Sequence, residues 1–588
     1  MSPIVRGPNE PIENLAIGTV IEVDGSRVIA ELDPRLSELS RVHGGETYSV
    51  GQFGSVIKIH FGRRIVYALV GRLRMKAEYQ AERGVVSQVT SDERVLEADL
   101  FGEGEWVKDT TEVPPRWNLR FERGVATYPL PQQTVYLTPK SELRVIYGSP
   151  TGATIRLGEY VGSAGTPCFA DMNELLGKHT AVLGATGSGK SAAVAAIMHG
   201  ILDSPPAEHG LWNPLILVLD PHNEYGAAFN QHTRLSTDEG SLRLPYWLLS
   251  LDETIALLVG KTEYAATSQS NIVKNALLKA RLDGARQLGI DVAKLTVDSP
   301  VPYVLGDPSG LDECGEVDGA RYEIGFVGAV NAQRPTGRDK GKHEDYSKIL
   351  RKLDALRRDA RLAFLMTPWD GISDLLPDVL GQLLGSGSPV RIIDLSGIPN
   401  EIAGTASAAV ARIVFTVKLW QTTAERESSP ILLVCEEAHR YVPNSGAAQY
   451  EAAQSAIRRL AKEGRKYGIG LMLVSQRPSE VEATVLSQCN SWLVLRVTNE
   501  ADAAHVRAIL PDSMVGLSSV LSGLRRQEAV FVGQAAAIPS RITIRTLRSD
   551  QLPRSNDVDF SAGWKNPPLS TTDLETVAMR WRYQQRGT

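Results

Sequence analysis

One eight-residue segment carries the residue types and the spacing that bind phosphate. Residues 184–191 read GATGSGKS, which matches the pattern G-x-x-x-x-G-K-[ST] in full. In such a loop the glycines let backbone N–H groups turn toward phosphate oxygens, the lysine adds a positive charge, and the last hydroxyl can ligate Mg²⁺. Kinases, GTPases and motors share this loop, so it does not name the reaction. We expect a nucleotide-binding loop formed by Gly184, Ala185, Thr186, Gly187, Ser188, Gly189, Lys190 and Ser191.

Two adjacent carboxylates end the apolar run Ile431 to Cys435. One carboxylate at a strand tip can hold Mg²⁺, directly or through water, and a second can orient and deprotonate an attacking water. We therefore assign Glu436 to the metal, together with Ser191, and Glu437 to the water. The competing interpretation is a pair of solvated carboxylates at the start of a helix, where the helix dipole favours negative charge.

Five other polar residues are candidates for the same chemistry. Gln476 follows an apolar run and both donates and accepts hydrogen bonds, which suits a sensor of the γ phosphate or of the attacking water. An ordinary polar residue at a strand end is the competing interpretation. In a ring, Arg465 can reach the γ phosphate of a neighbouring subunit; Arg459 is the alternate, and a solvated basic helix is the competing interpretation. Asp220 either has a role at the nucleotide site, where it supports the water shell of the metal or couples the nucleotide state to the loop, or it forms a turn. His439 is either a phosphate sensor or a packed helix residue.

These residues must be positioned by strands, and the sequence contains several apolar runs of strand length. The runs are Ala181–Leu183, Leu215–Leu219, Arg391–Leu395, Ile431–Cys435, Gly470–Ser475 and Trp492–Val497. Apolar strands without alternation, separated by helical segments, are typical of a parallel sheet covered on both faces. The expected fold class is therefore α/β, with a P-loop core.

The N-terminal part has a different pattern. Ile17 to Leu32 places two β-branched runs around Asp24-Gly25-Ser26, and Gly54 to Leu73 repeats this pattern with Gly62-Arg63-Arg64 at the turn. Both segments predict hairpins. Two further strands are expected, at Thr134 to Thr138 and at Leu143 to Tyr147. Several short strands predict a small barrel within residues 1–150, and a sandwich is the alternative.

The middle and the end of the chain lack strand runs. Thr254–Leu282 and Tyr346–Leu365 read as helices, and the second has a basic face that is either solvated or in contact with DNA. The end of the chain is polar and finishes with a possible helix at Thr572–Gln584, in a segment that could cross to a neighbouring subunit. The expected domains are a barrel (1–150), an ATPase core (151–251 and 381–547), a helical insertion (252–380) and a tail (548–588).

Composition limits the class of protein. The 588 residues are 43% hydrophobic and 22% charged, which excludes a disordered or fibrous chain. The net charge of -5 means that any contact with nucleic acid must come from a local basic patch or a pore. No apolar run reaches the roughly 18 residues that span a bilayer, so we expect no membrane contact. The cysteines form no CxxC pair, which favours a reduced, cytoplasmic protein; they are Cys168, Cys314, Cys435 and Cys489.

Taken in order, the motifs resemble those of HerA-type ATPases, which belong with FtsK-like motors. The matching segments are GATGSGKS, LDPHNEY, EEAH, EGRKYG, SQRPSEV and LSQCNSWLVLRVTNEADAAHV, and the opening IGTVIEV resembles the small β-barrel of that family. The resemblance covers most of residues 14–547. It implies a RecA-like core, a homo-hexameric ring, hydrolysis of ATP with Mg²⁺ at subunit interfaces, and double-stranded DNA threaded through the pore. It also implies a partner nuclease, of the NurA type in DNA end resection, or a sirtuin-like or other effector in bacterial antiviral defence.

Residue by residue, the resemblance assigns Lys190 and Ser191 to the nucleotide and the metal, and Glu437 to catalysis. It assigns Gln476 to the sensor and Arg465 to the finger that acts on a neighbour. The chain departs from the family at Cys435-Glu436, where an aspartate-bearing strand end is commoner. The longer side chain of a glutamate would then reach the metal through a bridging water.

Three functions are compatible with these features. The main hypothesis is an ATP-driven double-stranded DNA translocase or helicase. The first rival is a nucleotide-gated ring that scaffolds and activates a partner nuclease, with translocation secondary; the barrel and the tail favour it because they lie outside the motor. The second rival is a small-molecule kinase, which needs neither Gln476 beside the acidic pair nor a large barrel and insertion.

Overall fold

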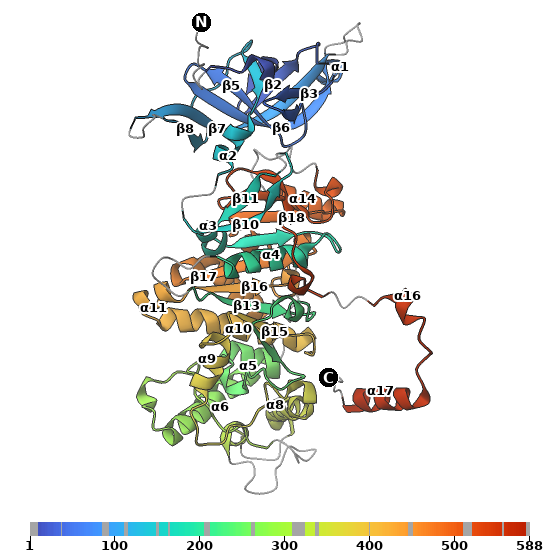
Figure 1. Ribbon diagram of the computed structural model, residues 1–588. Helices are drawn as coiled ribbons and strands as arrows, with labels where there is room; N and C mark the ends of the chain where they lie inside the picture. The colour runs from blue at the N-terminus through green and yellow to red at the C-terminus, as the bar shows by residue number, and fades with distance from the viewer. Residues whose placement is uncertain are drawn as a thin grey trace. The chain divides into compact units, whose positions relative to one another are not determined.

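The computed structural model divides the chain into two compact units (Figure 1). Unit 1 holds residues 1–204, 476–479 and 490–547, and unit 2 holds residues 205–475, 480–489 and 548–588. The expected ATPase core is thus shared between both units, and the domain boundaries drawn from the sequence stay predictions. The structure describes residues 10–36, 38–84, 93–110, 116–148, 152–162, 165–204, 212–259, 265–307, 324–335, 340–398, 400–444, 451–509, 520–554 and 558–583. Cys314 lies outside these ranges.

Unit 1 begins with a closed β-barrel. Its strands run in the order β2-β1-β9-β5-β6-β7, and an additional pairing of β2 with β7 closes the six-stranded ring. A seventh strand, β8, pairs with β7 outside this ring. The strands are β1 (Ala16–Asp24), β2 (Arg27–Leu32), β5 (Val56–Phe61), β6 (Arg64–Met75), β7 (Arg94–Asp109), β8 (Arg116–Arg123) and β9 (Thr134–Leu137). The barrel prediction is confirmed, and the sandwich alternative is wrong.

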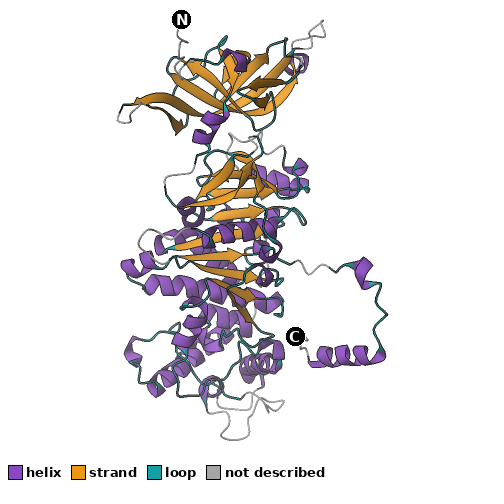
Figure 2. Ribbon diagram, viewed as in Figure 1, coloured by secondary structure: helices purple, strands orange, loops and turns teal. Residues whose placement is uncertain are grey.

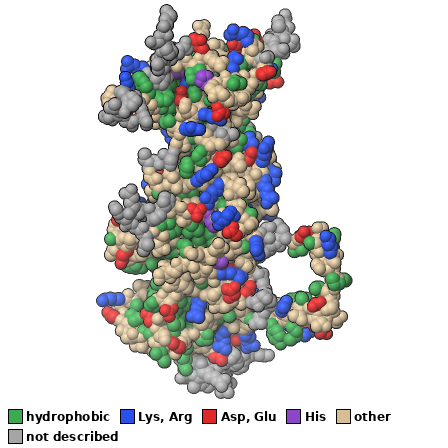
Figure 3. Space-filling view, in the orientation of Figure 1, with side chains coloured by type: hydrophobic (Ala, Val, Ile, Leu, Met, Phe, Trp, Pro, Cys, Tyr) green, Lys and Arg blue, Asp and Glu red, His purple; other side chains and the backbone are tan. Residues whose placement is uncertain are grey.

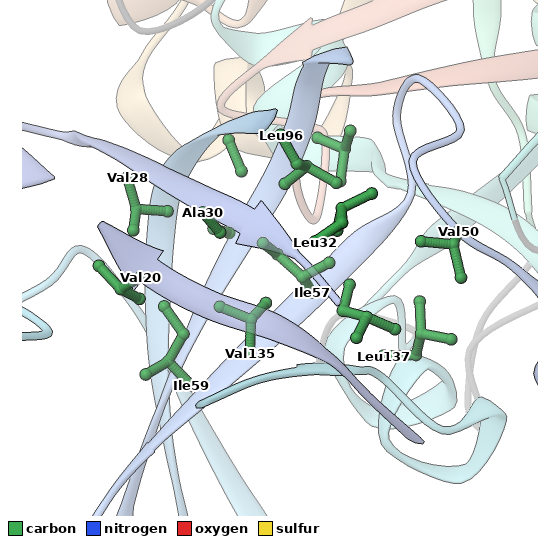
Figure 4. Packing of buried hydrophobic residues seen from close by; sticks show 14 of the residues in the cluster. Val20, Val28, Ala30, Leu32, Val50, Ile57, Ile59, Leu96, Val135 and Leu137 are labelled. Carbon is green, nitrogen blue, oxygen red and sulfur yellow. The ribbon is translucent and has the colours of Figure 1, made fainter. Parts of the chain in front are cut away.

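The barrel follows from hairpins and from alternation along its strands. Gly25-Ser26 and Gly62-Arg63 join β1 to β2 and β5 to β6, as the hairpin signals predict. Side chains from facing strands meet in the interior of the barrel, where Val20, Val28 and Ile57 are fully buried (Figure 4). Burial of one such side chain stabilises the fold by about 1.5–3 kcal/mol. The smaller elements of this region are β3 (Ser40–His43), β4 (Glu46–Ser49) and α1 (Lys76–Glu82).

The predicted strand Leu143–Tyr147 is wrong, because these residues belong to helix α2 (Lys140–Ile146) and its C-cap. Glu142, Leu143 and Ile146 are buried on one side of this helix, which packs against β8. Tertiary packing therefore overrides the β propensity of Val145, Ile146 and Tyr147.

A buried ion pair fixes α2 to the barrel. Lys58 Nζ on β5 lies 2.6 Å from Glu142 Oε1, and the Tyr67 hydroxyl on β6 donates to Glu142 Oε2 at 2.9 Å. The side chains of Lys58 and Glu142 are 2% and 5% exposed. Burial and the nearby Glu142 charge raise the pKa of Tyr67 far above its ordinary value, so its hydroxyl remains a donor.

The rest of unit 1 is a mixed sheet with strand order β11-β10-β20-β19-β18-β12. β12 and β18 are parallel, and the other neighbours are antiparallel. This sheet carries the strand before the phosphate loop. Its elements are β10 (Thr154–Tyr160), β11 (Pro167–Asp171), α3 (Met172–Gly177), β12 (Thr180–Leu183), α4 (Lys190–Leu202), β18 (Ser491–Leu495), α14 (Glu500–Ile509), β19 (Glu528–Gly533) and β20 (Ser540–Ile544).

Unit 2 contains a parallel sheet with strand order β17-β16-β13-β15-β14. Every residue of β15, β16 and β17 is buried, so both faces of these strands are covered, and Figure 2 shows helices on both sides. The prediction of a parallel sheet is therefore confirmed for this unit. The strands are β13 (Leu215–Asp220), β14 (His232–Ser236), β15 (Val390–Asp394), β16 (Ile431–Cys435) and β17 (Ile469–Ser475), and the helices that follow them include α10 (Asn400–Trp420), α11 (Thr423–Ser428), α12 (Glu451–Glu463) and α13 (Ala483–Leu486).

The expected helical insertion is present, with different helix limits. Ser250 and Glu253 form a capping box, so the first helix begins at Leu251 instead of Thr254. The predicted helix Thr254–Leu282 is two helices, and residues 260–264 lie outside the described ranges. The predicted helix at Tyr346–Leu365 ends at Arg358, where Asp359 caps a short 3₁₀ turn. The helices are α5 (Leu251–Leu258), α6 (Ala265–Gln287), α7 (Gly325–Asn331), α8 (Lys340–Arg358) and α9 (Leu376–Leu384).

One described helix is long and apolar enough to cross a membrane. It is the segment Ile402–Trp420 of α10, but 72% of its apolar stretch is buried inside the structure. Its Arg412 and Lys418 side chains bond Glu253 and Ser429 within unit 2. We interpret α10 as a core helix, because a buried helix of a globular protein can be equally long and apolar.

The tail of unit 2 contains α16 (Phe560–Gly563) and α17 (Thr571–Tyr583), in agreement with the predicted terminal helix, although Gln584 lies outside the described ranges. Neither helix has a buried residue. Trp564 and Trp581 are 81% and 76% exposed, and Figure 3 shows hydrophobic side chains on the surface of the tail.

We predict that Glu142→Gln destabilises the barrel by about 3 kcal/mol or more, because it leaves the Lys58 charge buried without its counter-charge. The measurement is thermal unfolding followed by calorimetry. Glu46→Gln is the matched control: Glu46 pairs with Lys140 at 2.7 Å, but it is 51% exposed, and its loss should cost less than about 1 kcal/mol. Equal effects of the two substitutions would contradict a structural role for the buried pair.

Candidate nucleotide-binding site

The phosphate loop of unit 1 follows directly from its flanking elements. All four residues of β12 are buried, and α4 begins at Lys190 with Gly189 as its N-cap. Gly187 and Gly189 adopt left-handed backbone conformations, with φ of 73° and 98°. Side chains other than glycine are strained there, so both glycines are needed to turn the chain into the helix. The backbone N–H groups at the start of α4 and the positive end of its dipole form a site for an anion.

Backbone hydrogen bonds hold this loop from two sides. The Ala185 N–H donates to the carbonyl of Arg496, just beyond β18, at 2.8 Å. The Gln527 N–H donates to the carbonyl of Ser188 at 3.0 Å, and Gln527 itself has a left-handed backbone with φ of 64°. The loop is thus held in place before any ligand binds, which lowers the entropic cost of binding.

The sensor candidate, Gln476, forms a hydrogen bond with the phosphate loop. The hydroxyl of Thr186 donates to Oε1 of Gln476, at the start of the 476–479 segment of unit 1. Lys190 is buried, with 5% exposure, and Ser188 is fully buried. Gln476 therefore lies beside the loop, as a sensor of its ligand would have to.

The acidic candidates lie in unit 2, at the carboxyl ends of parallel strands. Asp220, Asp394, Glu436 and Glu437 follow or end β13, β15 and β16, and each is 3% exposed or less. Asp220 and Asp394 are register partners. The interpretation of Glu436 and Glu437 as solvated carboxylates is therefore wrong. Buried carboxylates require partners, because burial disfavours the charged form.

Asp220 forms a turn. Its Oδ1 accepts from the His222 N–H at 3.2 Å and its Oδ2 accepts from the Tyr225 N–H at 3.0 Å. Burial raises the pKa of Asp220 to about 6, against the lowering effect of these two bonds. Of the two interpretations of Asp220, the structure supports the turn.

The two glutamates differ in their surroundings. Glu436 Oε2 accepts the hydroxyl of Tyr225 at 2.8 Å. Glu437 has φ of 53° and ψ of 51°, which is uncommon for a residue with a side chain and costs on the order of 1–3 kcal/mol. His439 Nδ1 lies 3.3 Å from Glu437 Oε2 and 3.3 Å from the Ser475 hydroxyl at the end of β17. His439 is thus in contact with the Glu437 carboxylate, a position that suits a functional residue.

The two arginine candidates, Arg459 and Arg465, differ in their side-chain contacts. Arg459 on α12 stacks over the ring of Phe415 at 4.3 Å and lies 3.8 Å from Glu463. Arg465, in the 3₁₀ turn Gly464–Tyr467, is exposed, and no side-chain bond or ion pair ties it to another described residue. Arg465 is therefore the arginine that is available to another molecule.

The donor set fits Mg²⁺ held together with a nucleotide. Among the described residues, no group of three or more His, Cys, Asp or Glu side chains could hold a metal alone. Mg²⁺ is usually bound through one or two protein oxygens together with substrate phosphates and water. Ser191, in the first turn of α4 in unit 1, and Glu436, after β16 in unit 2, each carry an oxygen of the kind that Mg²⁺ prefers.

Two supporting residues escape the sequence analysis. Tyr225 lies in the LDPHNEY segment, in which only the aspartate is a candidate from the sequence. An aromatic residue in a polar turn is nevertheless a signal for an anchoring role. Gln527 carries no signal, because its contact with the phosphate loop depends on a left-handed backbone that glutamine rarely adopts.

Comparison with known proteins agrees with these features. A family model described as the central domain of the helicase HerA matches residues 155–414. The probable DNA double-strand break repair helicase HerA of Methanocaldococcus jannaschii is 24% identical over 561 residues, which cover 89% of this chain and 98% of the relative. The DNA double-strand break repair helicase HerA of Pyrococcus furiosus is 27% identical over 445 residues, covering 70% and 72%. A solved structure of VirB4 of Thermoanaerobacter pseudethanolicus aligns with a TM-score of 0.44 and 16% identity, over 68% of this chain and 99% of that one.

The strand β12, the phosphate loop and α4, in an α/β chain with buried acidic strand ends, define a P-loop ATPase. The family model and the relatives show the particular family that the chain resembles: it is similar to the HerA helicases. It is therefore an ATP-hydrolysing enzyme.

We predict that Gly184→Ala weakens ATP binding at least tenfold, or about 1.4 kcal/mol. A Cβ at this position would lie 2.8 Å from Ser188 Oγ and 2.9 Å from Leu495 Cβ, so the loop would have to shift. Titration with a fluorescent ATP analogue measures the effect. Gly177→Ala is the control, because no heavy atom lies within 4 Å of its added Cβ. Unchanged affinity of the Gly184 variant would contradict a preformed loop.

Proposed function

We propose that this chain is an ATP-dependent double-stranded DNA translocase or helicase that works as a homo-hexameric ring with a partner nuclease, in DNA end processing or antiviral defence. The observation that carries the proposal is the phosphate loop, with its two left-handed glycines and buried Lys190. Relatives named as DNA double-strand break repair helicases support DNA as the substrate. We also propose that the protein acts in the cytoplasm.

We propose a role for each of these residues from its chemistry. Lys190 and the backbone N–H groups of the loop bind the β and γ phosphates of ATP. Ser191 and Glu436 hold Mg²⁺, which neutralises phosphate charge when bound. Glu437 orients and deprotonates the attacking water, with His439 in contact with its carboxylate. Gln476, bonded to Thr186 in the loop, senses the γ phosphate.

Two features support assembly into a ring. Arg465 is exposed in unit 2, as an arginine that acts on the nucleotide of a neighbour must be. The tail exposes Leu574, Val577 and Trp581 at helical spacing on α17, with exposures of 52%, 46% and 76%. Such an apolar stripe is normally covered in the functional assembly. We propose that a neighbouring subunit covers it.

Contact with DNA needs local positive charge, because the chain is acidic overall. Figure 3 shows basic and acidic side chains interspersed over the viewed face, in agreement with a net charge of -5. Exposed basic side chains of unit 2 that support contact with phosphates are Arg351, Lys352, Lys462, Arg465 and Lys466. Affinity for duplex DNA should therefore fall steeply with salt.

The scaffold hypothesis has its own supporting observation. The barrel has a hydrophobic core of its own. The tail exposes tryptophans, which offer an apolar surface for a partner protein. A nucleotide-gated ring could use these surfaces to activate a nuclease, with translocation secondary.

We predict that the wild-type protein hydrolyses ATP faster when duplex DNA is present. Lys190→Ala should bind ATP poorly. Glu437→Gln should still bind ATP, but its kcat should fall about 10²–10⁴-fold. Hydrolysis is measured by phosphate release and binding by a fluorescent ATP analogue. DNA-stimulated hydrolysis retained by Lys190→Ala would exclude the assignment, and turnover indifferent to DNA would favour a small-molecule kinase. A partner nuclease that stays fully active with Glu437→Gln would favour the scaffold.

We also predict that Arg465 acts on the site of a neighbour. Arg465→Ala should lower ATP hydrolysis about 10³-fold, whereas Arg459→Ala should keep most of it. Mixing Arg465→Ala subunits with Glu437→Gln subunits should restore part of the activity, because some interfaces then combine an intact Glu437 with an intact Arg465. Two inactive variants that stay inactive when mixed would show that Arg465 does not act across an interface.

A further inference from the structure

The segment after β13 is built around one carboxylate. Both oxygens of Asp220 accept backbone N–H groups, from His222 at 3.2 Å and from Tyr225 at 3.0 Å. Asn223, between them, has a left-handed backbone with φ of 54°, which asparagine tolerates better than most residues. The turn therefore fixes the backbone of Tyr225 at a set distance from the end of β13.

The turn points Tyr225 toward the acidic strand. Tyr225 is fully buried, and its hydroxyl donates to Glu436 Oε2 at 2.8 Å, across 211 positions of sequence. Glu436 follows β16, which pairs with β13 in parallel, and its N–H donates to the carbonyl of Leu219 at 3.2 Å.

A hydrogen bond from a buried phenol to a carboxylate restricts the carboxylate. Glutamate has one more rotatable bond than aspartate, so it loses more freedom when it is held in one orientation. A donor that already fixes its carboxylate removes that cost from the binding step. A carboxylate has about four lone-pair sites, and the hydroxyl of Tyr225 occupies one of them.

We propose that Tyr225 is a positioning residue that orients Glu436 for the metal–nucleotide complex, and that Asp220 serves this purpose by folding the turn that carries Tyr225. This inference rests on the proposed role of Glu436 toward Mg²⁺. It gives the LDPHNEY segment the function of carrying Tyr225 to Glu436. The sequence alone allows either a metal-supporting aspartate or a plain turn.

Tyr225→Phe tests the inference, because it removes only the hydroxyl. The readout is binding of Mn²⁺ in the presence of ADP, followed by electron paramagnetic resonance. We expect the Mn²⁺ affinity to fall about tenfold or more, while binding of ADP without metal stays unchanged. The Mg²⁺ concentration for half-maximal ATP hydrolysis should rise by the same factor.

Tyr441→Phe is the matched control. Tyr441 is 1% exposed in the same unit, and its hydroxyl has no hydrogen-bond partner within the described part of the chain. This substitution should leave Mn²⁺ affinity unchanged. If both variants lowered Mn²⁺ affinity equally, the effect would be a general consequence of altering a buried tyrosine, and the inference would be wrong.

A double-mutant comparison identifies the partner. Glu436→Asp keeps the charge but shortens the reach to Tyr225, so by itself it should also weaken Mn²⁺ binding. In that background Tyr225→Phe should have little further effect, because the bond is already lost. Unchanged Mn²⁺ affinity in Tyr225→Phe, or full additivity of the two substitutions, would overturn the inference. Wild-type protein that binds no metal with nucleotide would instead refute the proposed function, and the inference with it.

Discussion

Burial of negative charge at the ends of parallel strands is the constraint that shapes unit 2. Four carboxylates lie at the carboxyl ends of β13, β15 and β16 with little exposure. Each has a different local partner: backbone N–H groups for Asp220, Arg234 at 2.7 Å for Asp394, the hydroxyl of Tyr225 for Glu436, and His439 for Glu437. These polar partners offset the cost of desolvation. The offset is partial, because burial still raises the pKa of Asp220 and Glu437 has a left-handed backbone.

The phosphate loop of unit 1 is organised by the opposite requirement, because its backbone donors must remain directed toward a ligand. Two hydrogen bonds hold the shape of the loop, and they use the N–H group of Ala185 and the carbonyl of Ser188. The left-handed glycines supply the turn that hydrogen bonds alone could not impose. Contacts within unit 1 thus hold the phosphate loop in shape, and contacts within unit 2 hold the buried carboxylates.

The sequence predicts those parts of the fold in which a local pattern has only one stable outcome. Ile431–Cys435 is too short and too apolar for anything but a covered strand, and Gly25-Ser26 between two β-branched runs forms a hairpin. Leu143–Tyr147 has high β propensity but becomes helical, and Glu142 of this helix pairs with the buried Lys58 of β5. Contacts between distant segments, such as that of Tyr225 with Glu436, leave no periodic trace in the sequence. The choice between Arg459 and Arg465 likewise depends on the ring of Phe415, which only the fold brings near.

No residue of helix α17 is buried, and this has a thermodynamic consequence. A helix of 13 residues is marginal in water by itself, since isolated helices shorter than about 12–15 residues gain too little from propagation to offset nucleation. Its order must then be supplied by whatever molecule it binds. The end of the chain should accordingly exchange between coil and helix in dilute solution, and its folding should be coupled to association and depend on protein concentration.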